Sequence, residues 1–204
     1  MPNDMSIVRT KTERRFNPHV LLLRGAQHHL ETAKKNQPSC DYDWLAIIVL
    51  SALSLEAIGN SYGKVLIPNW KQLIGDLIRK KEGASPIKKL ELVAARCGIQ
   101  PDFASHPWLT ARKLADFRDL IAHAKREHLK FEGDCNESNY GEILGAKLEA
   151  DVEKMITEDF AKQSCEAVEQ IVSALNKTLK ESELYELTYC GHESQAEILK
   201  VTPA

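Results

Sequence analysis

The sequence predicts an all-α protein, a bundle of four to five main helices with a short helical insertion. Apolar residues recur at spacings of three and four in several long stretches, as on the buried face of a helix. No strand-like alternation dominates any part of the chain. With 204 residues, 43% hydrophobic and 27% charged, the chain has the length and composition of one globular core.

The first half of the predicted bundle contains its two clearest helices. Residues 1–17 are polar and basic and are expected to form a flexible N-terminal segment. Pro18 begins the first helix, with Asn17 as a fair N-cap, and the helix ends near residues 35–36. The second helix, expected at 44–62, carries an apolar stripe with a regular helical period: Leu45, Ile48, Val49, Ala52, Leu55 and Gly59.

Glu56 falls within that stripe, which makes it the most unusual residue of the second helix. A carboxylate buried there must be neutral or paired, because an unpaired buried charge is costly. Alternatively, Leu53 and Leu55 turn the apolar face so that Glu56 lies at its edge. The sequence leaves both possibilities open.

The remaining elements follow a short insertion at about 65–105. It contains a modest helix at 71–80 and a second one that begins at Ser85-Pro86 and stops at Gly98. Another helix is expected from His106 to Phe131, then a polar loop and a long helix at 147–182. The bundle therefore spans 18–184, and 185–204 form a C-terminal tail that contains a short strand or helix.

Charge is distributed unevenly along the chain. Residues 1–131 carry 21 Lys and Arg against 13 Asp and Glu, whereas residues 132–204 carry 6 against 16. A basic body suits an anionic ligand such as RNA, and a lysine and arginine cluster at 79–89 could attract a phosphate backbone. Solvated helix faces that attract one another explain the same pattern.

The cysteine spacing and the shortness of the apolar runs argue against several other classes of protein. The five cysteines are dispersed, without a Cys-x-x-Cys pair, so neither a disulfide framework nor a cysteine zinc site is expected. Cys190 and His192 are only two candidate metal ligands, and we expect no metal and no cofactor. No apolar run suggests a membrane span, and the N-terminus lacks a secretory signal pattern, so a cytoplasmic protein is expected.

The predicted helix at 106–131 carries Arg118 and His123, with four residues between them. This arrangement resembles the Arg-x(4–6)-His signature of HEPN domains, small helical bundles many of which are metal-independent ribonucleases. With nine arginines and seven histidines, about one such match is expected by chance, and Arg24 with His29 also matches. That pair lies in the first helix, where the family does not place its motif, and is interpreted as surface groups.

The resemblance implies an endoribonuclease that cleaves RNA by attack of the 2′-hydroxyl, with Arg118, His123 and Asp119 as catalytic residues. His123 would move the proton. Arg118 would bind the phosphate. Asp119, four residues before His123, could orient the imidazole, and Glu56 could hold Arg118 in place.

Further basic residues on the same helix are candidate RNA contacts: Arg112, Lys113, Lys125 and Arg126. The apolar face of this helix is predicted to comprise Leu114, Phe117, Leu120, Ile121 and Ala124, with Ala115, Asp119 and His123 on another side and Arg118 at the boundary.

Arg118 and His123 differ by about 140° on an ideal helix. They would converge only at a helix distortion or across the two-fold axis of a homodimer, the arrangement common in the family. The resemblance also suggests the effector of a toxin–antitoxin or antiviral defence system, with a cognate antitoxin or regulatory protein as partner. The rival hypothesis is a non-catalytic HEPN-like module that binds RNA, a nucleotide or a protein. Other catalytic signatures, such as a phosphate loop or Gly-x-Ser-x-Gly, are missing from the sequence.

Overall fold

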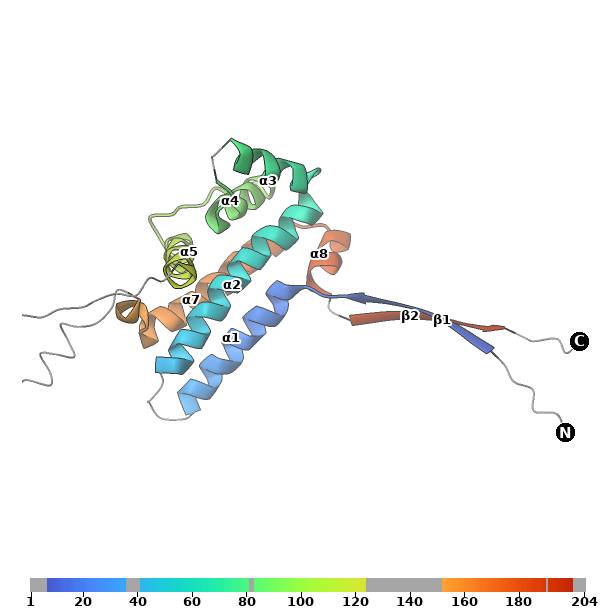
Figure 1. The fold of residues 1–204 in the computed structure, drawn as a ribbon, viewed down its shortest axis with the longest axis horizontal. Helices are drawn as coiled ribbons and strands as arrows, with labels where there is room; N and C mark the ends of the chain where they lie inside the picture. The colour runs from blue at the N-terminus through green and yellow to red at the C-terminus, as the bar shows by residue number, and fades with distance from the viewer. Residues whose placement is uncertain (1–6, 36–40, 81–82, 124–151, 190, 200–204) are drawn as a thin grey trace, which may run out of the picture.

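The computed structural model describes residues 7–35, 41–80, 83–123, 152–189 and 191–199. Its elements are, in order, β1 (Ile7–Arg15), α1 (Pro18–Lys35), α2 (Asp41–Leu66), α3 (Trp70–Arg79), α4 (Pro86–Arg96), α5 (Trp108–Ala122), the short 3-10 helix η1 (Glu153–Met155), α7 (Glu158–Asn176), α8 (Glu181–Thr188) and β2 (Gly191–Leu199) (Figure 1). The helical bundle confirms the predicted all-α class. A two-stranded ribbon extends from it.

Helix α2 is the centre of the bundle, in contact with every other described α-helix. Its side chains are buried on several faces, and Ile47, Leu55 and Ile58 are fully inaccessible. The helix is longer than predicted because it continues through Gly63. A Cβ at that position would overlap the ring of Trp70, so the glycine lets α3 begin directly against α2.

Among the described residues, α2 is also the one helix long and apolar enough to cross a membrane by length and composition. A central helix of a bundle meets the same criteria, because it too must be apolar on most sides. Half of its most apolar window is buried inside the protein.

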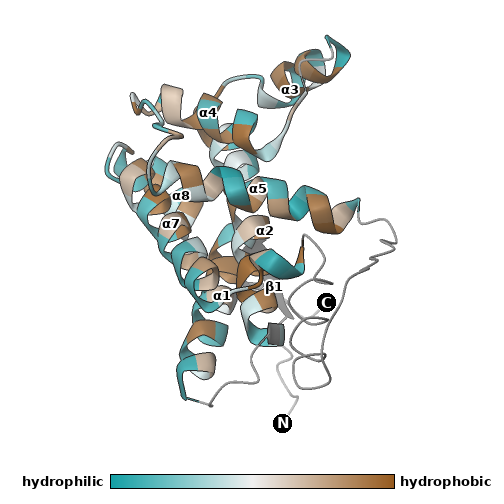
Figure 2. Cartoon of the chain, turned by 90° about the vertical axis from the view of Figure 1, so that its left-hand side faces the viewer, coloured by the Kyte–Doolittle hydropathy of each residue, from teal (hydrophilic) through white to brown (hydrophobic). Residues whose placement is uncertain are grey.

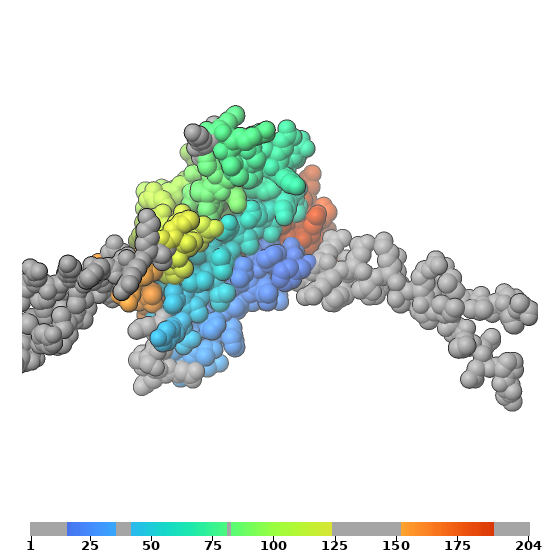
Figure 3. Space-filling model, viewed as in Figure 1, coloured from blue at the N-terminus to red at the C-terminus, as the bar shows by residue number. Residues whose placement is uncertain are grey.

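Helix α1 has the predicted bounds and lies alongside α2, as Figure 3 shows on one face of the molecule. Its buried residues include Ala26 and Ala33, whose small side chains allow the two helix backbones to approach closely. Asn17 was predicted to cap this helix. Its side-chain amide donates hydrogen bonds to the carbonyls of Glu186 and Tyr189, at 3.0 and 2.9 Å, which ties the start of α1 to the end of α8.

A buried polar group lies where α1, α2 and α8 meet. His19 is only 2% exposed, and its ring packs edge-on against Tyr62, with centroids 5.4 Å apart. Burial lowers the pKa of His19 to about 4, and its hydrogen bond to the backbone of Leu187 opposes that shift only in part. The Tyr62 hydroxyl donates to the Asn176 side chain at 2.6 Å. These contacts fix α8 and α7 to the central helix.

The predicted insertion forms α3 and α4, which pack at one end of α2 (Figure 1). The start of α4 is as expected, since the Ser85 hydroxyl accepts a hydrogen bond from the backbone of Lys88 at 3.2 Å and Pro86 takes the first helical position. Gly98, which follows the helix, has a φ of 70°. Helix α3 has one apolar and one polar side (Figure 2), but only Trp70 is buried.

The last third of the chain differs from the prediction. The expected helix at 147–182 is interrupted, and within the described residues its regular part is α7, which begins at Glu158. Thr157 stops it from starting earlier, because its extended backbone and side chain cap the helix by accepting a hydrogen bond from Phe160 at 3.1 Å. Helix α8 then forms separately.

The segments predicted as a flexible N-terminus and a tail meet in the ribbon. β1 pairs with β2 in antiparallel register, from Ile7 opposite Leu199 to Arg15 opposite Gly191. The sequence of β1 is polar and lacks the apolar alternation by which strands are predicted, so this strand could not be predicted from periodicity.

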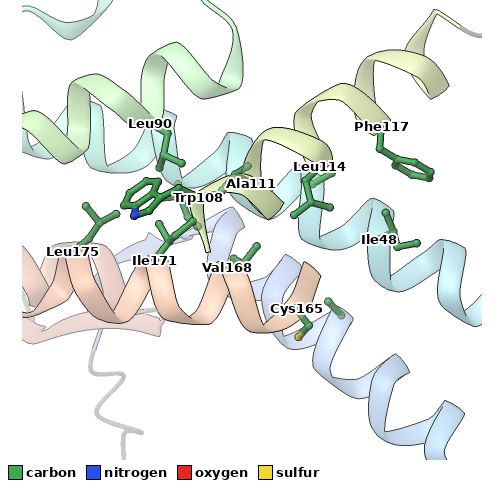
Figure 4. Packing of buried hydrophobic residues seen from close by; sticks show 14 of the residues in the cluster. Ile48, Leu90, Trp108, Ala111, Leu114, Phe117, Cys165, Val168, Ile171 and Leu175 are labelled. Atoms are coloured by element: carbon green, nitrogen blue, oxygen red, sulfur yellow. The ribbon is translucent and has the colours of Figure 1, made fainter. Parts of the chain in front are cut away.

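One layer of the hydrophobic core lies between α2, α5 and α7. Figure 4 shows α5 and α7 running in opposite directions, with Trp108, Ala111 and Leu114 facing Ile171 and Val168. All five of these side chains are less than a tenth exposed. Fully burying one such aliphatic side chain stabilises the fold by about 1.5–3 kcal/mol, so this layer fixes the position of α5 and of the residues it carries.

Candidate functional site

Helix α5 positions the candidate site, although its buried face is rotated from the predicted one. Leu114 and Phe117 are fully buried as expected, but Leu120 and Ile121 are 42% and 39% exposed. Ala115, predicted on the opposite side, is buried. Ala124 lies outside the described residues. The apolar-face prediction was therefore right for Leu114 and Phe117 and wrong for Ala115 and for the last turn of the helix.

The reason is the point at which α7 begins. Phe117 packs edge-on against Phe160, in the first turn of α7, with ring centroids 6.4 Å apart. The two helices run in opposite directions, and Phe160 is only two residues from the start of α7, so the turn of α5 after Phe117 points beyond that start. Leu120 and Ile121 are exposed there for lack of a partner helix in the described chain.

Arg118 lies between two carboxylates. Its Nη2 is 3.2 Å from Oε2 of Glu56 on α2, and its Nη1 donates a hydrogen bond of 2.8 Å to Oδ1 of Asp119. The hydrogen bond that the guanidinium donates to Asp119, and then the negative charge of Glu56, raise the pKa of Arg118. The contact between Glu56 and Arg118 that the sequence suggested is present, and it joins the central helix to the motif helix.

Glu56 combines the two possibilities left open by the sequence. Its side chain is 24% exposed, so it lies at the edge of the buried face of α2, and it is also paired. Its second oxygen, Oε1, lies 3.9 Å from Nζ of Lys89 on α4. One carboxylate thus links three helices. Sequence reasoning missed Lys89 as part of this group and assigned it only to the basic cluster at 79–89.

His123 occupies the end of α5, where the regular helix stops. It is the C-cap, with φ −113° and ψ 16°, and its backbone N–H donates to the carbonyl of Asp119 at 3.0 Å. The imidazole is exposed, and it forms no hydrogen bond or ion pair with another described side chain. The helix is therefore regular from Arg118 up to His123, and the described residues show no distortion between them that would bring the two side chains together.

Asp119 does not hold the position expected of it. It was predicted to orient His123, but its carboxylate binds Arg118 instead. Arg112 and Lys113, the predicted RNA contacts earlier on α5, are both exposed. Lys125 and Arg126 lie outside the described residues.

An apolar pocket of about 260 Å³ adjoins Arg118. It lies between α2 and the last turns of α5 and is lined by Val49, Ala52, Leu53, Phe117, Arg118, Ile121 and Ala122. Arg118 is the one charged residue of this lining. The sequence offered no signal for the pocket, because the pocket depends on how the last turns of α5 lie against α2.

Neither the pair of Arg24 and His29 nor a metal cluster among the described residues competes with this site. Arg24 is exposed on α1, and His29 is bound at 3.3 Å to Asp43, with 40% of its side chain exposed. Within the described ranges, no three His, Cys, Asp or Glu side chains are grouped as metal ligands would be. Cys190 lies outside those ranges.

No protein-family model, no curated protein and no solved structure matches this chain.

Proposed function

We propose that the protein is a metal-independent endoribonuclease of HEPN type, with Arg118 and His123 as its catalytic residues. The observation that carries the proposal is the ion pair by which Glu56 of α2 holds the guanidinium of Arg118. Arg118 stands five positions before His123, the histidine at which α5 ends. An arginine held by a carboxylate and, five positions later, an exposed imidazole without a partner among the described side chains are the two groups that cleavage of an RNA strand needs.

The reaction divides between these two residues. The ribose 2′-oxygen attacks the adjacent phosphorus, and the bond from phosphorus to the 5′-oxygen breaks. The products are a 2′,3′-cyclic phosphate and a 5′-hydroxyl. His123 takes the proton of the 2′-hydroxyl or gives one to the leaving oxygen. Arg118 binds the phosphate oxygens and the charge that grows on them in the transition state.

In this proposal, the phosphate takes the position that the Asp119 carboxylate occupies beside Arg118. It is the more exposed partner of Arg118, with 55% of its side chain accessible against 24% for Glu56. An exposed ion pair contributes roughly 0–1 kcal/mol to stability. A phosphate that accepts two hydrogen bonds therefore replaces Asp119 at Nη1 of Arg118 more easily than it replaces Glu56 at Nη2. Glu56 then continues to hold Nη2. Arg112 and Lys113 bind flanking phosphates along the exposed side of α5.

The proposed active form is a homodimer. Leu53, Leu120 and Ile121 are exposed apolar side chains at or beside the pocket next to Arg118, and a second protomer would cover them. A two-fold contact there would bring His123 of one protomer toward Arg118 of the other. The HEPN resemblance also suggests a setting in defence or in a toxin–antitoxin pair.

The test is an RNA cleavage assay in EDTA with parent, His123→Ala and Arg118→Ala proteins, the product ends being identified by mass. We expect cyclic phosphate ends from the parent and a loss of at least about a hundredfold in each variant, the lower range for removal of an acid–base group. His28→Ala, at an exposed histidine on α1, is the control and should cut like the parent. Undiminished cleavage by His123→Ala would refute its assignment.

A second candidate is a non-catalytic HEPN-like module that binds RNA, a nucleotide or a protein at the same place. Two observations favour it: Asp119 binds Arg118 instead of His123, and the pocket beside Arg118 is almost entirely apolar. Equal inactivity of parent and His123→Ala, together with binding that Arg118→Ala removes, would establish this function instead.

A further inference from the structure

Lys89 lies behind the candidate site and faces inward. Only 13% of its side chain is exposed, although lysines are among the residues least often buried. Its Cβ lies 3.0 Å from the position that a Cβ on Gly59 of α2 would occupy, so the absence of a side chain there lets α4 bring Lys89 close to α2. Its neighbour Lys88, by contrast, is 44% exposed and binds Glu91 on its own helix.

The ammonium of Lys89 and the guanidinium of Arg118 lie near different oxygens of Glu56. Nζ of Lys89 is 3.9 Å from Oε1, and Nη2 of Arg118 is 3.2 Å from Oε2. A carboxylate that faces Arg118 alone can accept two parallel hydrogen bonds from the guanidinium fork. With Lys89 attracting Oε1, Glu56 presents mainly Oε2 to Arg118, and Nη1 stays directed toward Asp119.

Charge balance at this place supports the same conclusion. Glu56 and Asp119 carry two negative charges, and Arg118 with Lys89 carries two positive ones. Without Lys89, the single arginine would face both carboxylates. The interaction with Glu56 is less screened by water than the one with Asp119, because Glu56 is less exposed. Glu56 would then draw the guanidinium inward, away from an incoming phosphate.

We propose that Lys89 is a positioning residue, which holds Glu56 so that one edge of the Arg118 guanidinium remains available to a phosphate. The inference rests on the proposed function for its substrate. It assigns Lys89 no contact with RNA, unlike the view of residues 79–89 as a phosphate-binding cluster.

The first experiment measures binding of a single-stranded oligoribonucleotide by the His123→Ala protein, which removes cleavage from the measurement. Lys89→Met is added to it, because methionine keeps an unbranched side chain over Gly59 but lacks the charge. Lys88→Met is the matched control, and Lys89→Arg is the conservative variant. We expect Lys89→Met to raise the dissociation constant on the order of tenfold, with recovery in Lys89→Arg and no change in Lys88→Met.

The salt dependence of binding distinguishes positioning from direct contact. A lysine that neutralises a phosphate releases a counterion, and its loss lowers the slope of log affinity against log salt by about 0.7 for a single strand. For Lys89→Met we expect an unchanged slope. A lower slope, or an unchanged affinity, would overturn the proposal.

An NMR experiment on the full chain tests the positioning even if the parent binds no RNA. The Nε–Hε resonance of Arg118, assigned by its disappearance in Arg118→Lys, should move in Lys89→Met and stay in place in Lys88→Met. Failure of RNA binding with a moved resonance would contradict the proposed function and leave Lys89 as the residue that sets Arg118. A resonance that stays in place in both variants would refute the role of Lys89.

Discussion

Acidification should destabilise this protein through His19. The imidazole is 2% exposed, and burial lowers its pKa from 6.5 to about 4, so the folded state holds it neutral while the unfolded chain takes up a proton below pH 6.5. Stability from the neutral ring is complete above pH 6.5 and is lost as the pH falls toward 4. Linkage gives a loss of about 2 kcal/mol between pH 8 and pH 5, and about 3 kcal/mol below pH 4.

The measurement is the free energy of unfolding in urea at a series of pH values for the parent and for His19→Phe. Phenylalanine keeps a ring against Tyr62 but cannot titrate. The variant should be less stable at pH 8, since the Leu187 backbone loses its hydrogen bond, but its stability should fall less between pH 8 and pH 5. The difference between the two pH dependences isolates His19 from all other groups.

His28→Gln, at an exposed histidine of α1, is the control and should keep the parental pH dependence. A His19→Phe protein that loses as much stability as the parent between pH 8 and pH 5 would refute the reasoning. So would an imidazole resonance of His19 that titrates near its ordinary pKa of 6.5.

Further substitutions test the packing of the central helix. Gly63→Ala should destabilise the fold by about 1–3 kcal/mol, because its Cβ would overlap the ring of Trp70. Gly75→Ala, in open space on α3, should stabilise the fold by about 0.5–1 kcal/mol. Urea unfolding followed by tryptophan fluorescence measures both free energies, and equal effects would contradict the close contact between Gly63 and Trp70. Tyr62→Phe removes the 2.6 Å hydrogen bond to Asn176 and should cost about 1 kcal/mol, so an unchanged unfolding midpoint would show that this bond contributes no net stability.

The predictable parts of the fold are those set by local signals. Helix α1 begins and ends at the predicted residues, and Ser85 with Pro86 starts α4 as expected, because cap residues and prolines act within a few positions of themselves. The contact between Glu56 and Arg118 was also anticipated, since a carboxylate in an apolar stripe requires a partner.

The parts that could not be predicted depend on where elements meet in space. Periodicity placed Leu120 and Ile121 on the core face of α5, but their burial depends on how far α7 reaches along that helix. Likewise, Lys88 and Lys89 are adjacent and chemically identical in the sequence. Only the approach of α4 to Gly59 separates an inward lysine from an exposed one.

The ribbon of β1 and β2 also determines how the protein responds to mechanical force. Among the described residues, the pair farthest from the bundle joins Ile7 to Leu199, and the pair nearest to it joins Arg15 to Gly191 (Figure 1). A pull applied between the two chain ends therefore loads the hydrogen bonds one pair after another from the outside, as a zipper opens, instead of shearing all of them together. The ribbon should yield at low force in an optical-tweezers measurement, and the helical bundle should meet the load only after the ribbon has opened.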